Sequence, residues 1–96
     1  MINSNGNINF MYEIVINREA QDFFEEASAS LQKKLDRCFH TIKTYPRYHP
    51  NIKPLKGELA GYYRYRVGDY RDVYSINEEK QQIIVIVIAH RRQVYE

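Results

Sequence analysis

The sequence contains a single cysteine, Cys38, and no run of about eighteen apolar residues. One cysteine cannot build a disulfide framework or a zinc ribbon, so the count fits a protein of the reducing cytoplasm. Because a long apolar run is missing, we expect no membrane-spanning helix.

The N-terminal stretch "MINSNGNINF" lacks the basic start and the apolar core of a secretion signal. We therefore expect residues 1–10 to form a flexible polar tail, with Met11 as a candidate start of the folded part. A chain of 96 residues, 44% of them hydrophobic, is long enough for one small core. Residues 11–96 are accordingly predicted to form a single domain.

Several catalytic signatures are also missing. His40, His49 and His90 are scattered and have no acidic cluster with which to hold a metal. No glycine-rich phosphate loop precedes a helix, and no serine or cysteine lies in a recognisable nucleophile motif. We expect neither a metal nor another cofactor.

Positive charge is concentrated in the second half of the chain. The formal net charge is only +2, and up to residue 46 the acidic residues slightly outnumber the basic ones. The later bases include Arg47, Lys53, Lys56, Arg64, Arg66, Arg71, Arg91 and Arg92. This distribution favours a polyanionic partner over a merely solvated charged face.

The first half predicts a strand and a helical hairpin. The β-branched run at residues 14–16 indicates a strand, and Asn17 is a good N-cap for the helix that follows. Ser28 or Ser30 can cap a second helix, which ends before Pro46. Apolar residues recur at helical spacing in both helices: Ala20, Phe23, Phe24 and Ala27 in the first, and Leu31, Leu35, Cys38, Phe39 and Ile42 in the second.

Three strands are predicted in the second half, at residues 62–67, 70–76 and 82–90. The proline-rich stretch before them indicates an extended connection. The last strand is apolar almost throughout, so we expect it to be buried on both faces and central in the sheet. The order strand, helix, helix and antiparallel three-stranded meander predicts a small α+β domain, with the helical hairpin on one face and the other face open.

The pair Gly68-Asp69 fixes the register of the hairpin between the first two of these strands. Glycine at the first position favours a two-residue type II′ turn. That turn places Arg66 opposite Arg71. Because side chains alternate, one face then carries Tyr62, Arg64, Arg66, Arg71 and Val73. The tyrosines of the other face would pack against the helices with Asp72 among them, and the Tyr65 hydroxyl is the expected partner of that carboxylate.

Like charges opposite one another on a sheet destabilise it by about 0.2–1 kcal/mol. The clustered arginines are therefore better explained by an anion, and the guanidinium fork matches phosphate. If Ala89 and Arg91 share this face, Arg91 adds a fourth cation, and Tyr95 offers a ring on which a base can stack. A cationic groove of this kind can cleave RNA without a metal, because the 2′-hydroxyl supplies the nucleophile.

Two stretches, "KPLKGELAGYYRYRVGDYRDVYSI" and "HRRQVY", resemble the RelE branch of the RelE/ParE toxin superfamily. The likeness runs from residue 12 to the C-terminus and agrees with the predicted order of elements. It implies the toxin of a type II toxin–antitoxin system: a ribosome-dependent, metal-independent endoribonuclease that cuts messenger RNA in the A site. It also implies a RelB-like antitoxin that wraps the toxin, covers the basic groove and forms a hetero-oligomer with it.

The resemblance further assigns roles to individual residues. Arg64 and Arg66 take the basic positions of the first hairpin strand, and Arg71 takes that of the transition-state arginine. Arg91 corresponds to the proton donor proposed for the leaving oxygen, and Tyr95 to the base-stacking tyrosine. The residues expected to contact RNA or the ribosome are Lys53, Lys56, Arg47 and Arg92.

One departure concerns the general base. RelE has lysines where this chain has Arg64 and Arg66, and a guanidinium group holds its proton too tightly to act as a base. His90 is a candidate because histidine commonly exchanges protons near neutral pH. Strict alternation, however, points His90 away from Arg91 and toward the core, so a hydrogen-bonded structural histidine is an equal alternative.

Two other functions remain open. The ParE branch shares the fold but inhibits DNA gyrase without nuclease chemistry. A catalytically inactive toxin-like domain that acts only as a partner in repressor complexes is the third possibility.

Overall fold

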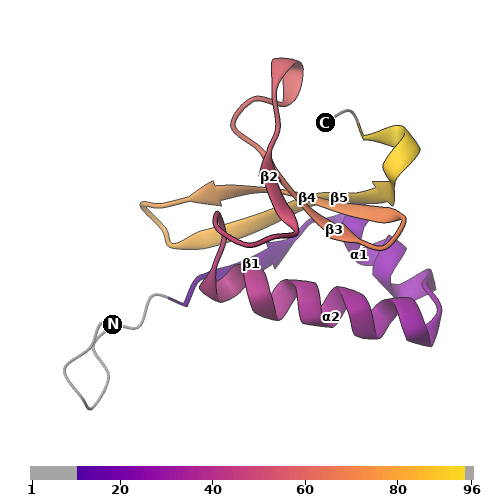
Figure 1. The fold of residues 1–96 in the computed structure, drawn as a ribbon. Coiled ribbons are helices and arrows are strands. Elements are labelled where there is room, and N and C mark those ends of the chain that lie inside the picture. Colours follow the sequence, from indigo (N-terminus) through magenta and orange to yellow (C-terminus); the bar gives the residue numbers. More distant parts are fainter. Residues whose placement is uncertain (1–10, 95–96) are drawn as a thin grey trace, which may run out of the picture.

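The computed structural model describes residues 11–94, so the predicted polar tail and Tyr95 lie outside the described residues. Its centre is a mixed five-stranded sheet (Figure 1). In spatial order the strands are β1 (Glu13–Ile16), β5 (Gln82–His90), β4 (Tyr70–Asn77), β3 (Tyr63–Val67) and β2 (Ile52–Pro54). β1 runs parallel to β5, and the remaining pairs are antiparallel. The predicted α+β class and the antiparallel meander are confirmed.

Two helices, α1 (Arg18–Glu26) and α2 (Ala29–Thr44), lie together on one face of the sheet, below it in Figure 1. The side chain of Asn17 accepts a hydrogen bond from the Ala20 backbone N–H at 3.0 Å. Ser28, the first of the two predicted candidates, caps α2 by accepting from the Leu31 N–H at 3.1 Å. Both caps satisfy donors that the first helical turn leaves without a partner. No helix within residues 11–94 combines the length and apolar character needed to cross a membrane.

The main core lies between this helical layer and the sheet. Leu35, Cys38 and Ile42 of α2 are fully buried against Ile83 and Val85 of β5. Cys38 is therefore a core thiol, as its place on the apolar stripe predicted.

β5 lies inside the sheet, but β4 occupies the central position. The prediction that β5 is buried on both faces is wrong in detail: Ile83, Val85 and Ile88 are buried, whereas Ile84 and Val87 are half-buried. Helices cover only one face, so the other side of β5 has thinner cover. A register shift opposite Val73 and Tyr74 leaves Ile86 as an extra residue between paired positions, which is a β-bulge.

The proline-rich connection contains a strand that the sequence did not indicate. β2 pairs antiparallel with β3, and Lys53 lies opposite Arg64. Its last residue is Pro54, which is tolerated because β2 is an edge strand and needs ladder hydrogen bonds on one side only. The connection is extended, as predicted, but it adds a fifth strand to the sheet.

The face opposite the helices is only partly open, which corrects the expectation of an uncovered surface. A second buried cluster forms there from Leu55, Val73 and Val94, with the partly buried Leu59, Tyr62, Val87 and Ala89 around it. The loop that contains the 3₁₀ helix η1 (Gly57–Leu59) and the C-terminal turn η2 (Arg91–Gln93) rise on this side of the sheet in Figure 1. Apolar side chains from both segments cover the middle of the face.

Candidate functional site

The β3–β4 hairpin positions three arginines in the predicted register. Arg66 lies opposite Arg71, and Arg64 lies opposite Val73. Gly68 has a φ of +58°, whereas Asp69 has no positive φ, in agreement with a type II′ turn. Because paired residues share a face, the three arginines lie on the side of the sheet away from the helices. We call Arg64, Arg66, Arg71 and Arg91 the arginine face.

Two of these arginines are built into the fold. Arg71 is only 7% exposed, and its Nη1 donates to the carbonyl oxygens of Gly68 and Tyr70 at 3.0 Å each. Arg64 is 6% exposed and donates from Nη1 to the carbonyl oxygen of Asn51 at 2.6 Å. These carbonyls fix the two guanidinium groups. Arg71 is therefore a buried, hydrogen-bonded side chain and not the exposed, repelled cation that we expected from the sequence.

Arg66 is exposed, and Asn51 holds it from the neighbouring segment. The Nη2 of Arg66 lies 3.3 Å from Oδ1 of Asn51, and the Arg66 backbone N–H donates to the Asn51 carbonyl at 2.9 Å. Asn51 therefore contacts both Arg64 and Arg66. Sequence reasoning missed it because its place follows from the pairing of β2 with β3.

The end of β5 brings Arg91 to the hairpin turn. The Arg91 backbone N–H donates to the Asp69 carbonyl at 2.8 Å, and Nε lies 3.9 Å from Oδ1 of the same residue. Both side chains are more than half exposed, so this ion pair is weak and a ligand can replace it. Ala89 lies opposite Arg71 and therefore contributes a small side chain to the same face.

His90 belongs to the other face, because it lies opposite Tyr70. The two rings meet edge to face with centroids 5.6 Å apart. Nδ1 of His90 accepts the Arg92 backbone N–H at 3.2 Å and thereby caps η2. The structure thus separates His90 from the arginine face and gives it a structural role, while the exposed Arg92 follows it in η2.

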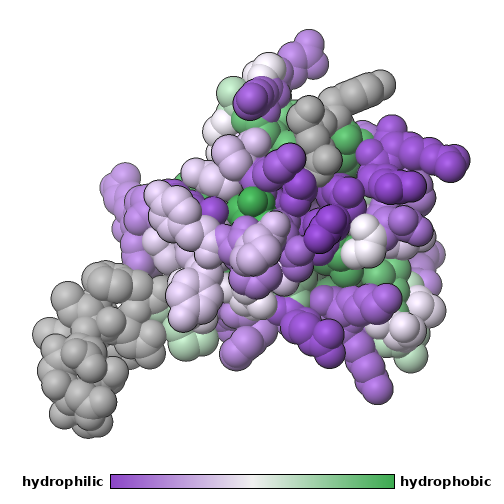
Figure 2. All heavy atoms as spheres, in the orientation of Figure 1, coloured by the Kyte–Doolittle hydropathy of each residue, from purple (hydrophilic) through white to green (hydrophobic). Residues whose placement is uncertain are grey.

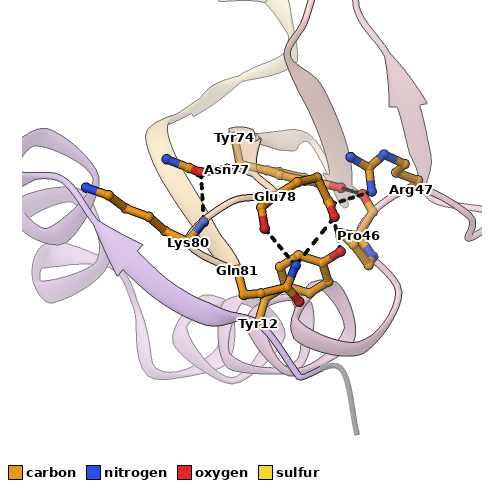
Figure 3. Close-up of polar contacts among 8 residues, drawn as sticks. All are labelled: Tyr12, Pro46, Arg47, Tyr74, Asn77, Glu78, Lys80 and Gln81. Atoms are coloured by element: carbon orange, nitrogen blue, oxygen red, sulfur yellow. Dashed lines mark hydrogen bonds and ion pairs between the residues drawn. The ribbon is translucent and has the colours of Figure 1, made fainter. Parts of the chain in front are cut away.

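The predicted RNA-contacting residues divide into two groups. Lys53 is exposed on β2 beside Arg64, and Lys56 is exposed at the start of η1. Arg47 lies instead near the β4–β5 loop, where its Nη1 bonds Oε1 of Glu78 at 2.9 Å (Figure 3). The Tyr12 hydroxyl donates to the same oxygen at 2.7 Å. The structure does not bring Arg47 together with the arginine face.

A mainly apolar hollow of about 380 Å³, with Glu58 also in its lining, lies on the same side of the sheet as the arginines. Leu59, Tyr62, Val73, Val87 and Val94 contribute to its lining, and Val73 is also the cross-strand neighbour of Arg64. In Figure 2, strongly hydrophilic side chains cover much of the visible surface and small hydrophobic patches lie between them. Cations beside an apolar hollow can bind the two parts of a nucleotide, its phosphate and its base.

A family model described as the ParE toxin of type II toxin–antitoxin systems, parDE, matches residues 14–95. The chain belongs to this family, within the RelE/ParE toxin superfamily. The superfamily predicted from the sequence is therefore confirmed.

Curated relatives and solved structures agree with this membership. Toxin RelG of Mycobacterium tuberculosis is 40% identical over 43 residues, which are 45% of this chain and 49% of RelG. Toxin RelE of the same organism is 42% identical over 43 residues, 45% of this chain and 44% of that protein. The match thus spans about half the length of these relatives.

Among solved structures, the YoeB/ParE toxin from Agrobacterium tumefaciens superposes with a TM-score of 0.75 at 25% identity, over 82% of this chain and 98% of that one. RelE in the RelE–RelB complex of Pyrococcus horikoshii gives a TM-score of 0.74 at 20% identity, over 88% and 99% of the two chains. These neighbours support the two-helix, five-stranded fold of this ParE-family protein.

A fully buried carboxyl group of this ParE-family chain lies behind the arginine face. Asp72 is fully buried on the helix side of β4, and the Cys38 thiol donates to its Oδ2 at 3.3 Å. The expectation that Tyr65 would be its partner is therefore wrong. Helix α2 passes over this point of the sheet and presents the thiol, a contact that strand register alone does not reveal.

Proposed function

We propose that the protein is the toxin of a type II toxin–antitoxin pair and cleaves messenger RNA in the ribosomal A site. The observation that supports this proposal is the arginine face: the hairpin register puts Arg64, Arg66 and Arg71 on one side of the sheet, and the end of β5 brings Arg91 to the hairpin turn. Arginine forks on a rigid sheet are suited to binding and stabilising a phosphate group whose charge increases in the transition state.

In the proposed reaction, the 2′-hydroxyl oxygen attacks the adjacent phosphorus and the bond from phosphorus to the 5′ oxygen breaks. The products are a 2′,3′-cyclic phosphate and a free 5′-hydroxyl. Arg71 and Arg64 hold the phosphate, since backbone carbonyls orient both side chains. Arg66 adds positive charge from an exposed position, and Arg91 donates a proton to the departing 5′ oxygen.

The 2′-hydroxyl gives up its proton to a solvent water during the attack, and Arg91 regains from water the proton that it passes to the 5′ oxygen. His90 lies on the opposite face from Arg71, so we propose that positioning and charge stabilisation dominate and that no side chain acts as a dedicated acceptor. Tyr95 remains the proposed base-stacking residue. Within residues 11–94 no three His, Cys, Asp or Glu side chains gather as metal ligands, and the proposed chemistry requires none.

The proposed partners are the ribosome, its message and an antitoxin. Several structural neighbours are complexes, among them RelBE2 of Mycobacterium tuberculosis and YoeB–YefM of Staphylococcus aureus. We propose that a RelB-like antitoxin with acidic residues wraps this chain, covers the arginine face and forms a hetero-oligomer with it. The activity would take place in the cytoplasm, where ribosomes translate the message.

The matching family model favours one alternative, a ParE-like inhibitor of DNA gyrase without nuclease chemistry. A catalytically inactive repressor partner is the other. Primer extension on a translated message, after brief expression of the free protein, separates all three. We expect cuts in register with codons, and none in cells that express Arg91→Ala at the same level.

Each alternative predicts a different outcome of the same experiment. DNA breaks with intact messages would establish the gyrase inhibitor and contradict the endoribonuclease. Normal growth with neither lesion would indicate the inactive partner.

A further inference from the structure

A second group of cations lies beside the arginine face. Lys34 and Arg37, about one helical turn apart on α2, line a hollow of about 210 Å³ together with Arg66 of β3. Asn51, Tyr65, Val67 and Gly68 form its other walls. The hollow thus lies between the helical layer and the edge of the sheet. We call Lys34, Arg37 and Arg66 the α2–β3 strip.

No acidic side chain neutralises Lys34 or Arg37 within the described part of the chain. Both side chains are exposed, and the ion pairs formed by residues 11–94 involve other basic residues. Asp69, which shares an adjoining hollow with Lys34, lies instead 3.9 Å from Arg91. The positive charge of the strip is therefore available to an external anion.

The strip is continuous with the arginine face through Arg66. This residue is the cross-strand neighbour of Arg71 and also lines the hollow. β2 begins at Ile52, so the edge of β3 at Val67, and the turn at Gly68 after it, extend beyond the pairing with β2. A strand lying on the arginine face can pass over this edge and continue along α2, where Lys33 extends the line of cations.

The composition of the strip favours a phosphate backbone over a protein segment. Protein interfaces depend on buried aromatic or apolar anchors. The large hydrophobic side chains exposed within residues 11–94 are Met11, Val15, Tyr45 and Tyr48, and none of them lines this hollow. Lysine and arginine without apolar anchors are typical of contacts to nucleic-acid phosphates.

We propose that the α2–β3 strip binds the backbone of the message on one side of the cleaved phosphate. This inference rests on the proposed endoribonuclease function and extends its substrate site by one or more phosphates. The strip would hold the strand in register, while the arginine face acts on the reacting phosphate.

The test is RNA binding by the full chain, measured as fluorescence anisotropy of a labelled 2′-O-methyl RNA of about twelve unpaired nucleotides. This probe cannot be cleaved through its 2′ oxygen. The variant is Lys34→Ala/Arg37→Ala. The matched control is Arg18→Ala/Lys80→Ala, which removes one arginine and one lysine from exposed positions outside the strip.

We expect the strip variant to lose about tenfold in affinity at low salt and the control to lose little. The slope of log K against log salt should fall by about 1.4 in the strip variant, since each phosphate contact on single-stranded RNA contributes about 0.7. Equal slopes in the two double variants would overturn the proposal. The proposal would also be overturned if the wild-type protein bound no probe, or if polyglutamate displaced the probe as readily as unlabelled RNA does.

This result is separable from the proposed function. Primer extension reports cleavage, whereas the uncleavable probe reports backbone binding alone. Binding that depends on the strip, without any cleavage of messages, would refute the endoribonuclease and leave the strip as an RNA-binding surface.

Discussion

The Cys38 thiol and the Asp72 carboxyl group form a hydrogen bond of 3.3 Å between helix α2 and the central strand β4. Both side chains are fully buried, and Oδ1 of Asp72 has no hydrogen-bond partner within the described residues. Asp72 directly follows Arg71, whose side chain lies on the opposite face. The contact therefore attaches the helical layer to the strand that carries the arginine face.

Burial raises the pKa of Asp72 from its ordinary value of 3.8 to about 7. The folded protein then binds a proton at this site between about pH 4 and pH 7 that the unfolded chain has already lost. The stability that Asp72 contributes is therefore fully present below about pH 4, and it decreases as the pH rises from about 4 to 7. We expect this group to lower the free energy of unfolding by roughly 2–4 kcal/mol across that window, as measured by urea denaturation.

Asp72→Asn should flatten this dependence and make the protein more stable than the wild type at pH 8, because the amide is neutral at every pH. Asp69→Asn, at an exposed carboxylate, is the control and should leave the wild-type profile almost unchanged. Parallel stability profiles for the wild type and Asp72→Asn would show that the buried carboxyl group does not titrate as expected.

A second prediction compares two arginines that lie opposite each other. Arg71→Ala should lower the free energy of unfolding by about 1–3 kcal/mol, because it removes the donor to two backbone carbonyls near the turn. Arg66→Ala removes an exposed side chain and should change stability by less than about 0.5 kcal/mol. Urea unfolding of the two variants measures the difference.

Both arginine variants should lose message cleavage, because both cations belong to the proposed site. Full stability in Arg71→Ala would mean that like-charge repulsion with Arg66 outweighs the carbonyl contacts. Full cleavage by the Arg71→Ala variant would show that Arg71 does not belong to the proposed site.

The positions of the arginines could be predicted because local rules determine them. A glycine at the first turn position selects the two-residue turn, which fixes the pairing of Arg66 with Arg71. Strand alternation then assigns the faces. The helix caps at Asn17 and Ser28 follow from equally local chemistry.

The contacts that were missed depend on segments distant in sequence. Cys38 and Asp72 are 34 positions apart, and their contact depends on where α2 crosses the sheet. Leu55 and Val94 cover the second face only because two loops fold back over it. The burial of Arg64 and its bond to Asn51 likewise require β2, which three prolines concealed.

A third prediction concerns Arg91, which is exposed and forms only a weak ion pair with Asp69. Arg91→Ala should abolish cleavage and change the free energy of unfolding by less than about 0.5 kcal/mol. Asp69→Asn removes the ion pair and keeps the cation, so cleavage should persist in that variant. Single-turnover cleavage together with urea unfolding tests both changes. Loss of cleavage in both variants would mean that the ion pair, and not the cation, is what the reaction requires.

The last prediction separates a structural from a catalytic role for His90. Its Nδ1 caps η2 by accepting the Arg92 N–H, and its ring lies against Tyr70 on the helix side of the sheet. Asparagine is also a good capping residue but cannot act as a general base, so His90→Asn keeps the first role and removes the second. We expect His90→Asn to cleave within about tenfold of the wild type and His90→Ala to be slower, because a loose η2 displaces Arg91. Equal losses of more than about a hundredfold in both variants, with a changed pH profile of single-turnover cleavage, would instead make His90 the proton acceptor.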